Sequence, residues 1–230
     1  EKLLKFKFKV KIEHFFDLPV GCGYGASGSG ALGTIFGLNR LLNLKMSKLK
    51  CGELAHIAEI VNKTGLGTVC GQIGGGLCIL TEPGYPCKTK QVYVPQDVII
   101  ISASFGKIPT KSILSDVNIS NRIKDAGRIA IDKIMLNPDY KNFIKCSIEF
   151  VKQSKIIESL QLGELEILIK DLNNLEVIGA SMNQLGRSVY VFCKHDKKKL
   201  VNEVLTSYNA SIKKYDLKVY RGDSIIFGKI

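Results

Sequence analysis

Glycine and serine dominate a stretch near the start of the chain, Pro19 to Thr34, which reads PVGCGYGASGSGALGT. Because glycine has no Cβ, a ligand can approach the backbone N–H groups of such a loop closely. The loop continues into a segment with helical character, Ala31 to Leu44. Backbone donors and the positive end of a helix dipole together favour anions, above all phosphate. The stretch therefore indicates a phosphate-binding loop.

Two common nucleotide motifs do not account for this loop. The spacing Gly23-x-Gly25-x-x-Gly28 matches a dinucleotide fingerprint, which also needs an acidic residue about 20 positions later. The chain is lysine-rich there, and Glu53 comes too late, at the start of another predicted helix. A Walker A motif needs a lysine that this loop lacks. A flexible turn and a phosphate site of another kind both stay open.

The same loop resembles the phosphate loop of the GHMP kinases, the family of galactose, homoserine, mevalonate and phosphomevalonate kinases. Its wider form, GCGYGASGSGALGT, is similar to the archaeal pantoate kinases within that family. Three later stretches are similar to the same subgroup: AHIAEIVNKTGLGTVCGQIGGG (Ala55–Gly76), SASFGKIPTKSIL (Ser102–Leu114) and ASMNQLGRSVYVF (Ala180–Phe192). The four motifs follow the order of the family and cover the first half of the chain and a short block near its end.

The resemblance implies a role for each of these motifs in binding ATP, Mg²⁺ and a substrate. Ser29 and Glu59 would hold Mg²⁺, which takes few protein ligands and prefers oxygen, and both would act in catalysis. His56 and Gly186 would contact the substrate. The ATP phosphates would lie in a cradle formed by Gly21, Gly23, Tyr24, Gly25, Ala26, Ser27, Gly28, Ser29 and Gly30.

The residue types alone leave simpler roles open for the same side chains. The Ser29 hydroxyl could cap the helix that begins beside it. Glu59 precedes Lys63 by four residues on the polar side of a predicted amphipathic helix, Lys50 to Lys63. A surface ion pair at that spacing contributes only a few tenths of a kcal/mol. His56 has the position of an ordinary histidine on a helix surface.

Two positions depart from the family pattern. Thr68 occupies the position of an aspartate that commonly follows the TGxG sequence, and threonine neither acts as a base nor brings charge to a metal. Leu80 stands where pantoate kinases tend to have an arginine near a substrate anion. Because phosphoryl transfer depends mainly on positioning and electrostatics, these departures affect the expected choice of substrate more than the expected type of reaction. Arg187 is a nearby cation that could touch a phosphate, although an arginine at a strand start is usually solvated.

Composition narrows the classes of partner. The chain has 230 residues, 45% of them hydrophobic, and a net charge of +12. That length accommodates two domains with substantial cores, and the charge suits nucleic acid, an anionic membrane or a phosphorylated metabolite. The lysines are dispersed and aromatic residues do not alternate with arginine, so no nucleic-acid partner is expected. No apolar run approaches the roughly 20 residues of a membrane span, so no membrane partner is expected, and a homodimer stays open.

The seven cysteines are scattered and form no CxxC pair. An odd, dispersed set argues against both a disulfide framework and a zinc site. The expected compartment is therefore a reducing cytoplasm.

Hydrophobic patterning predicts a half-buried strand at Lys5 to Ile12 and mainly helical structure over residues 111–175, with breaks at Asn137-Pro138 and Gly163. Further strands are expected at residues 77–80, 98–102, 188–193 and 211–217, and a further helix at 197–207. The resemblance implies an α+β fold with two domains, which are a ribosomal-protein-S5-like α/β domain at residues 1–95 and a ferredoxin-like α+β domain at residues 96–230. The family has an earlier segment with its first motif, so the first domain of a chain that begins at Glu1 is expected to be incomplete.

The function implied by the resemblance is an ATP-dependent phosphotransfer to the primary hydroxyl of pantoate, giving 4-phosphopantoate for coenzyme A synthesis. Thr68 and Leu80 leave two alternatives open. One is a GHMP kinase that acts on another hydroxy acid or a polyol. The other is a relative that binds the nucleotide without catalysis.

Overall fold

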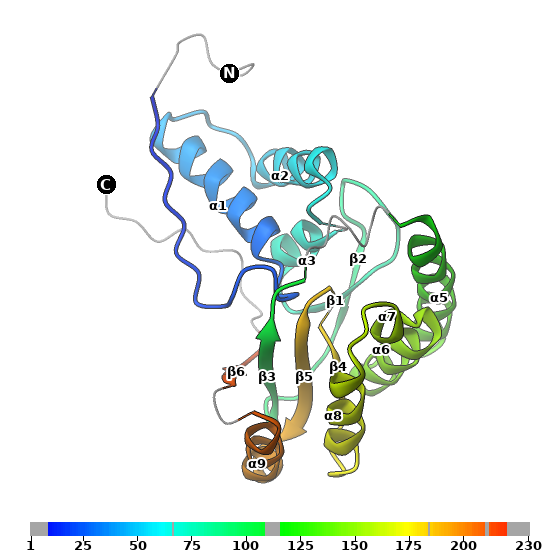
Figure 1. Cartoon of the computed structure of the whole chain (residues 1–230). Coiled ribbons are helices and arrows are strands. Elements are labelled where there is room, and N and C mark those ends of the chain that lie inside the picture. Colours follow the sequence, from blue (N-terminus) through cyan, green and yellow to red (C-terminus); the bar gives the residue numbers. More distant parts are fainter. Residues whose placement is uncertain (1–8, 66, 109–115, 184, 210–211, 220–230) are drawn as a thin grey trace.

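The computed structural model of the chain describes residues 9–65, 67–108, 116–183, 185–209 and 212–219 (Figure 1). No helix in these ranges is long and apolar enough to cross a membrane. The helices of eight or more residues are α1 (Ala26–Leu41), α2 (Lys48–Asn62), α5 (Val117–Leu136), α6 (Tyr140–Ser154), α8 (Gly163–Asn173) and α9 (Lys198–Tyr208). The shorter helices are α3 (Thr68–Gly74), α7 (Ile156–Ser159) and the 3₁₀ turn at His195–Lys197. The strands are β1 (Leu77–Leu80), β2 (Thr89–Val92), β3 (Val98–Gly106), β4 (Gly179–Met182), β5 (Arg187–Lys194) and β6 (Lys213–Leu217).

Four strands form an antiparallel sheet in the order β4-β5-β3-β6. Helices connect β3 to β4, β5 follows β4 directly, and α9 connects β5 to β6. This succession and strand order give the ferredoxin-like arrangement that the sequence predicts. The α+β fold class is therefore confirmed. Strands β1 and β2 form a separate antiparallel pair.

The main core lies on one face of the four-stranded sheet. Alternate residues of β3 and β5 point to this face, as the two-residue period of a strand requires; they include Ile101 and Val191, which are fully buried. Helices α8 and α9 pack there through buried residues four positions apart, Leu168 and Leu172 on α8 and Val201 and Leu205 on α9. This spacing is that of an amphipathic helix face.

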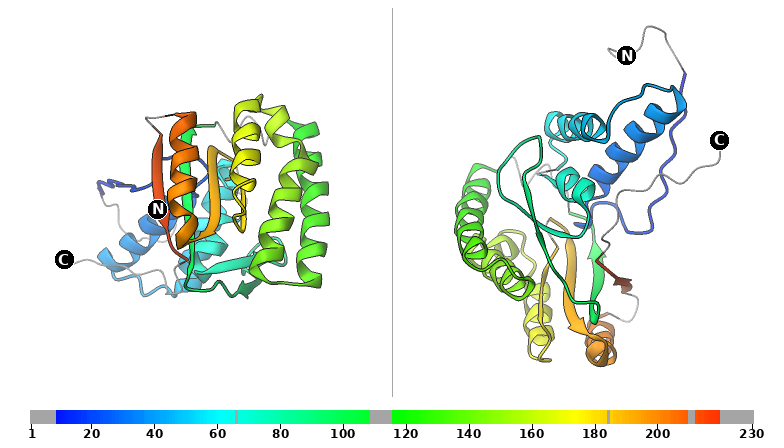
Figure 2. Two further views of the ribbon diagram at one scale, coloured as in Figure 1. Left: turned by 90° about the horizontal axis from the view of Figure 1, so that it is seen from below. Right: turned by 180° about the vertical axis from the view of Figure 1, so that it is seen from behind.

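Helices α1, α2 and α3 form a second group beyond one end of the sheet, as Figures 1 and 2 show from several sides. Each helix contributes one buried residue to a small core, namely Leu32, Ala55 and Val69. This group contains the glycine-rich stretch. Pro95, the predicted domain boundary, lies between β2 and β3, and the division at that residue stays a prediction.

Several predicted elements have different ends, and three elements were not expected. Helix α1 begins at Ala26 rather than Ala31, because tertiary packing holds glycine and serine residues of low helix propensity in its first turns. The helical stretch is broken at Asn137-Pro138, as predicted, and its second break lies just before Gly163, which is the first residue of α8. The glycine-containing α3 and the short strands β2 and β4 carry weak periodic signals, and the sequence did not predict them. Residues 111–115 and Ser211 of the predicted elements lie outside the described residues.

The predicted strand at Lys5 to Ile12 is wrong where it can be checked. Lys9 to Ile12 is irregular, and Val10 and Ile12 are 41% and 51% exposed. A strand needs partners for its backbone groups and a face to bury, and no strand of the described ranges pairs with this segment. Residues 5–8 lie outside the described residues.

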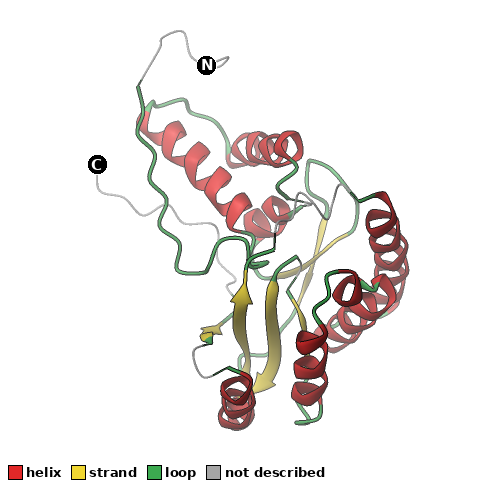
Figure 3. Ribbon diagram, viewed as in Figure 1, coloured by secondary structure: helices red, strands yellow, loops and turns green. Residues whose placement is uncertain are grey.

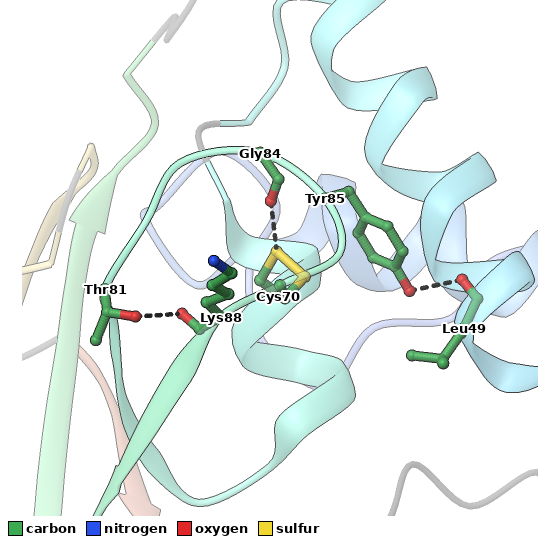
Figure 4. The surroundings of a disulfide bond; sticks show 7 residues. Leu49, Cys70, Thr81, Gly84, Tyr85 and Lys88 are labelled. Carbon is green, nitrogen blue, oxygen red and sulfur yellow. Dashed lines mark hydrogen bonds between the residues drawn. A yellow bond between two sulfur atoms is a disulfide. The ribbon is translucent and has the colours of Figure 1, made fainter.

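A disulfide joins Cys70 of α3 to Cys87 in the loop between β1 and β2 (Figure 4). In the same region the Tyr85 hydroxyl donates to the Leu49 carbonyl at 2.6 Å, which attaches the loop to α2. The expectation that the cysteines form no disulfide is therefore wrong for this pair. The two residues are distant in sequence, and only the tertiary contact between α3 and the loop brings them together.

Gly33 is expected to be a place where the chain can be stabilised. It lies on the exposed side of α1, and a Cβ there would meet no atom within 4 Å. Alanine loses less backbone entropy than glycine when a helix forms, so Gly33→Ala should raise the free energy of unfolding by about 0.5–1 kcal/mol. Urea unfolding would measure this change. A lower stability would contradict an open, helical position.

Candidate active site

The glycine-rich loop places three glycines in the left-handed region just before α1. Gly21, Gly23 and Gly25 have φ angles of 79°, 85° and 71°, which residues with a Cβ rarely adopt. Figure 3 shows the loop leading directly into the helix. Gly25 is the N-cap, no side chain caps the helix, and its first turn has no acidic residue. The N–H groups of residues 26–28 are therefore available to an anion.

Main-chain contacts hold the loop against the ends of two sheet strands. The Ile108 N–H donates to the Gly21 carbonyl at 2.9 Å, just beyond β3. The Ser188 hydroxyl of β5 donates to the Cys22 carbonyl. Gly186 lies so close to the same backbone that an added Cβ would be 2.0 Å from the Cys22 carbonyl carbon. The predicted substrate residue Gly186 thus contacts the glycine-rich loop itself.

Tyr24 joins the loop to the interior of the sheet. Its hydroxyl lies 2.8 Å from the Ser102 hydroxyl, which donates to the Val189 carbonyl at 2.6 Å and accepts from the Asn183 amide at 3.2 Å. A serine hydroxyl has one hydrogen, so Tyr24 is the donor to Ser102. Burial raises the pKa of Tyr24, which keeps its phenol protonated for this role. The role of Ser102 was missed by sequence reasoning because its partners are far apart in the chain.

Glu59 is the buried acid of the site, with 2% of its surface exposed. The Ser27 hydroxyl donates to its Oε1 at 2.6 Å. Its Oε2 is buried and has no hydrogen-bond partner among the described residues. Gly28 and Gly65 pack against it, because an added Cβ would lie 3.2 Å from Oε2 at Gly28 and 2.3 Å from it at Gly65. Burying a carboxylate oxygen without a partner is costly, so this arrangement suits a bound cation.

The surface role that the sequence left open for Glu59 is wrong. Glu59 belongs to the buried face of α2 together with Cys51 and Ala55. Lys63 ends that helix as an exposed C-cap, and no ion pair joins it to Glu59 in the described ranges. The position of the glycine-rich loop, which covers this face, decided the burial. Helical spacing alone assigns Glu59 to the polar side.

The Ser29 and Ser27 hydroxyls have different hydrogen-bond partners, which residue type alone does not predict. The exposed Ser29 hydroxyl lies 3.3 Å from the Gly25 carbonyl oxygen and 3.2 Å from that of Ala26, within its own helix. Such contacts are common for serine in the first turns of a helix. No hydrogen bond joins Ser29 to Glu59 among the described residues, whereas Ser27 makes one. The structure therefore brings Ser27 to the acid, a residue that the sequence placed only in the phosphate cradle.

Helix α3 packs against the start of α1. The Gln72 amide donates to the Gly25 carbonyl at 3.0 Å. Thr68 contacts the same glycine through its methyl group, since an added Cβ at Gly25 would lie 2.3 Å from Thr68 Cγ2. The position of the family aspartate thus carries an apolar contact to the loop. Gln72 was not singled out in the sequence because α3 was not predicted.

His56 stands three residues before Glu59 on α2 and contacts the loop between β1 and β2. Its ring is 5.9 Å from the ring of Tyr85, which belongs to the loop between β1 and β2. Leu80, at the other unusual position, packs close to Gly67 at the start of α3. Neither residue forms a hydrogen bond or ion pair with the glycine-rich loop in the described part of the chain.

The described residues contain no group of three or more His, Cys, Asp or Glu side chains that could hold a metal ion. A zinc or calcium cage would need more ligands than Ser27 and Glu59 provide. Mg²⁺ keeps most of its water ligands and is held by one or two protein oxygens with substrate phosphates. The orphaned Glu59 Oε2 next to a hydroxyl and an uncapped helix start fits that ion.

Comparison with known proteins decides the family. A family model described as GHMP kinases N terminal domain matches residues 1–76. The pantoate kinase of Methanocaldococcus jannaschii is 33% identical over 198 residues, which cover 85% of this chain and 70% of that protein. The chain belongs to the GHMP kinase family. The resemblance of its loop and of three further motifs is thereby confirmed.

Other GHMP kinases extend the match over most of the chain. The pantoate kinase of Thermococcus kodakarensis is 27% identical over 213 residues, 91% of this chain and 68% of that protein. A solved structure titled "Phosphotransferase related to CoA biosynthesis pathway" superposes with a TM-score of 0.78 at 25% identity, and the match covers 90% of this chain and 66% of that one. The chain thus spans about two thirds of the length of these relatives.

Proposed function

We propose that this GHMP kinase transfers the γ-phosphate of ATP to the hydroxyl of a small hydroxy acid, with pantoate as its substrate, in the cytoplasm. The observation that carries the proposal is the buried Glu59 carboxylate, which has one oxygen on Ser27 and the other without a partner, beside the uncapped start of α1. A bound phosphate would accept hydrogen bonds from the N–H groups at the start of α1, and its cation would contact the Glu59 oxygen that has no partner. The names of the two archaeal relatives support pantoate as the substrate.

In the proposed reaction the chain mainly positions charge. The N–H groups at the start of α1 would hold phosphate oxygens, and Tyr24 and Gly186 would fix the loop that presents them. Ser27 and Glu59 would hold Mg²⁺, which supplies charge neutralisation on the phosphates when bound. Ser29 stays a candidate from the sequence for the same cation. Thr68 cannot take the proton of the substrate hydroxyl, and a loose phosphoryl-transfer transition state places little demand on a base.

Turnover with pantoate is the direct test. The protein should release ADP when ATP, Mg²⁺ and pantoate are present, and release should depend on pantoate. Homoserine, mevalonate and other hydroxy compounds would be assayed in parallel. ADP release with another of these compounds and not with pantoate would show that the protein is a kinase with a different substrate.

Thr68 favours a second candidate function, a nucleotide-binding protein without catalysis. At the position where the family commonly has an aspartate, Thr68 makes a methyl contact with Gly25 instead. This candidate predicts that ATP binds, as measured by calorimetry, and that no hydroxy compound releases ADP. Thr68→Asp should then restore turnover. The Cys70–Cys87 disulfide disfavours the cytoplasmic location, because disulfides are uncommon in that compartment, and it does not discriminate between the two candidate functions.

A further inference from the structure

Lys107 lies directly on the glycine-rich loop. An added Cβ at Gly21 would be 3.4 Å from both Cβ and Cγ of Lys107, so the stem of the lysine covers this glycine. The next residue, Ile108, is hydrogen-bonded to the Gly21 carbonyl. The backbone of Lys107 is therefore held beside the loop, while its side chain is exposed.

Arg187 reaches the same place from the neighbouring strand. It is the first residue of β5 and pairs in register with Gly106, where β3 ends. Its Cδ is 4.0 Å from the position of a Cβ on Gly106, the residue before Lys107. Gly186, the residue before Arg187, packs against the backbone of Cys22 in the loop. Two cations from adjacent strand ends thus flank the loop.

Neither cation has a counter-ion among the described residues. By comparison, Lys194, at the far end of β5, lies 3.2 Å from Asp97, and Lys198 of α9 lies 2.6 Å from Asp216 of β6. The segments that meet at the loop, residues 18–30, 102–108 and 185–189, contain no Asp or Glu. The positive end of α1 adds to the same potential. Two unpaired cations at a helix N-terminus favour an anion.

We propose that Lys107 and Arg187 bind an oxyanion of the reactants, either the carboxylate of the hydroxy acid or a phosphate of the nucleotide. The proposal rests on the kinase function above, in which both reactants are anionic. Leu80, which packs at Gly67, offers no charge to either reactant. Arginine binds carboxylate and phosphate through its planar fork, and lysine adds a point charge. The pair therefore supplies charge that the uncharged glycine-rich loop lacks.

Direct binding measurements test this pair apart from turnover. Pantoate and ADP with Mg²⁺ would each be titrated by calorimetry into the wild type, Lys107→Met, Arg187→Met and the double variant. Methionine keeps an apolar stem over the glycines and removes the charge. The matched control is Lys90→Met/Arg40→Met, which removes the same net charge at exposed residues of β2 and of the far end of α1. Lys107→Arg should retain binding.

The double variant should bind one of the two ligands about tenfold or more weakly, the scale of a lost charge-assisted contact. Weaker pantoate binding identifies the carboxylate, and weaker ADP binding identifies a phosphate. The wild-type affinity for that ligand should also fall more steeply with salt than that of the double variant. Unchanged affinity for both ligands relative to the control would overturn the proposal. A wild type that binds ADP and phosphorylates no hydroxy acid would overturn the kinase function alone. The ADP titration would then still show whether Lys107 and Arg187 bind a phosphate.

Discussion

Replacing Glu59 by glutamine is expected to give a folded protein with about a hundredfold to a thousandfold lower kinase turnover, the scale of losing one preorganised electrostatic group at a reaction centre. Glutamine keeps the shape and can still accept the hydrogen bond from Ser27. It removes the buried charge whose Oε2 has no partner, so the melting temperature should stay the same or rise. A loss of activity without a loss of stability is the diagnostic result.

Turnover and thermal unfolding would be measured together over a range of Mg²⁺ concentrations. Ser27→Ala should raise the Mg²⁺ concentration needed for half-maximal activity, because it removes the hydroxyl that donates to the Glu59 carboxylate. Ser29→Ala is the matched control, since that hydroxyl contacts only carbonyls of its own helix. A greater loss with Ser29→Ala would restore the assignment made from the sequence. Full activity of Glu59→Gln would refute a role in holding the cation.

Gly186→Ala is expected to displace the phosphate loop. The added methyl carbon would lie 2.0 Å from the Cys22 carbonyl carbon and 2.4 Å from the Gly23 nitrogen. Backbone atoms cannot rotate away as a side chain can, so either the loop or the turn before β5 must move. Overpacking of this kind costs about 1–3 kcal/mol of unfolding free energy. Displaced donors at the start of α1 should also lower nucleotide affinity and turnover by at least about tenfold, because small errors in position strongly slow catalysis.

Gly37→Ala is the control for this experiment, because a Cβ at that exposed position of α1 meets no atom within 4 Å. It should leave nucleotide affinity unchanged. Calorimetry with ADP and urea unfolding would be measured for both variants. Normal affinity and stability of Gly186→Ala would show that the close approach to the loop is not needed.

Short-range patterns determined much of this protein. The glycine and serine spacing near Tyr24 predicted a phosphate loop and pointed to the family, because a phosphate cradle restricts residue types over a few consecutive positions. Short, largely apolar runs predicted β3 and β5, and the structure buries residues on both faces of these two strands. Glu59 was selected through its motif and not through any physical signal of its own.

Tertiary structure alone decided how these pieces act together. Helical spacing placed Glu59 on a polar surface, and the loop packed over α2 made it a buried acid with Ser27 as its partner. The contacts of Ser102 with Tyr24, of Gly186 with Cys22 and of Lys107 with Gly21 join residues that are far apart in sequence. Which such residues meet depends on the packing of whole elements, and no local pattern encodes it. The sequence by itself therefore determined the glycine-rich loop and the family, whereas the fold decided which side chains surround the loop.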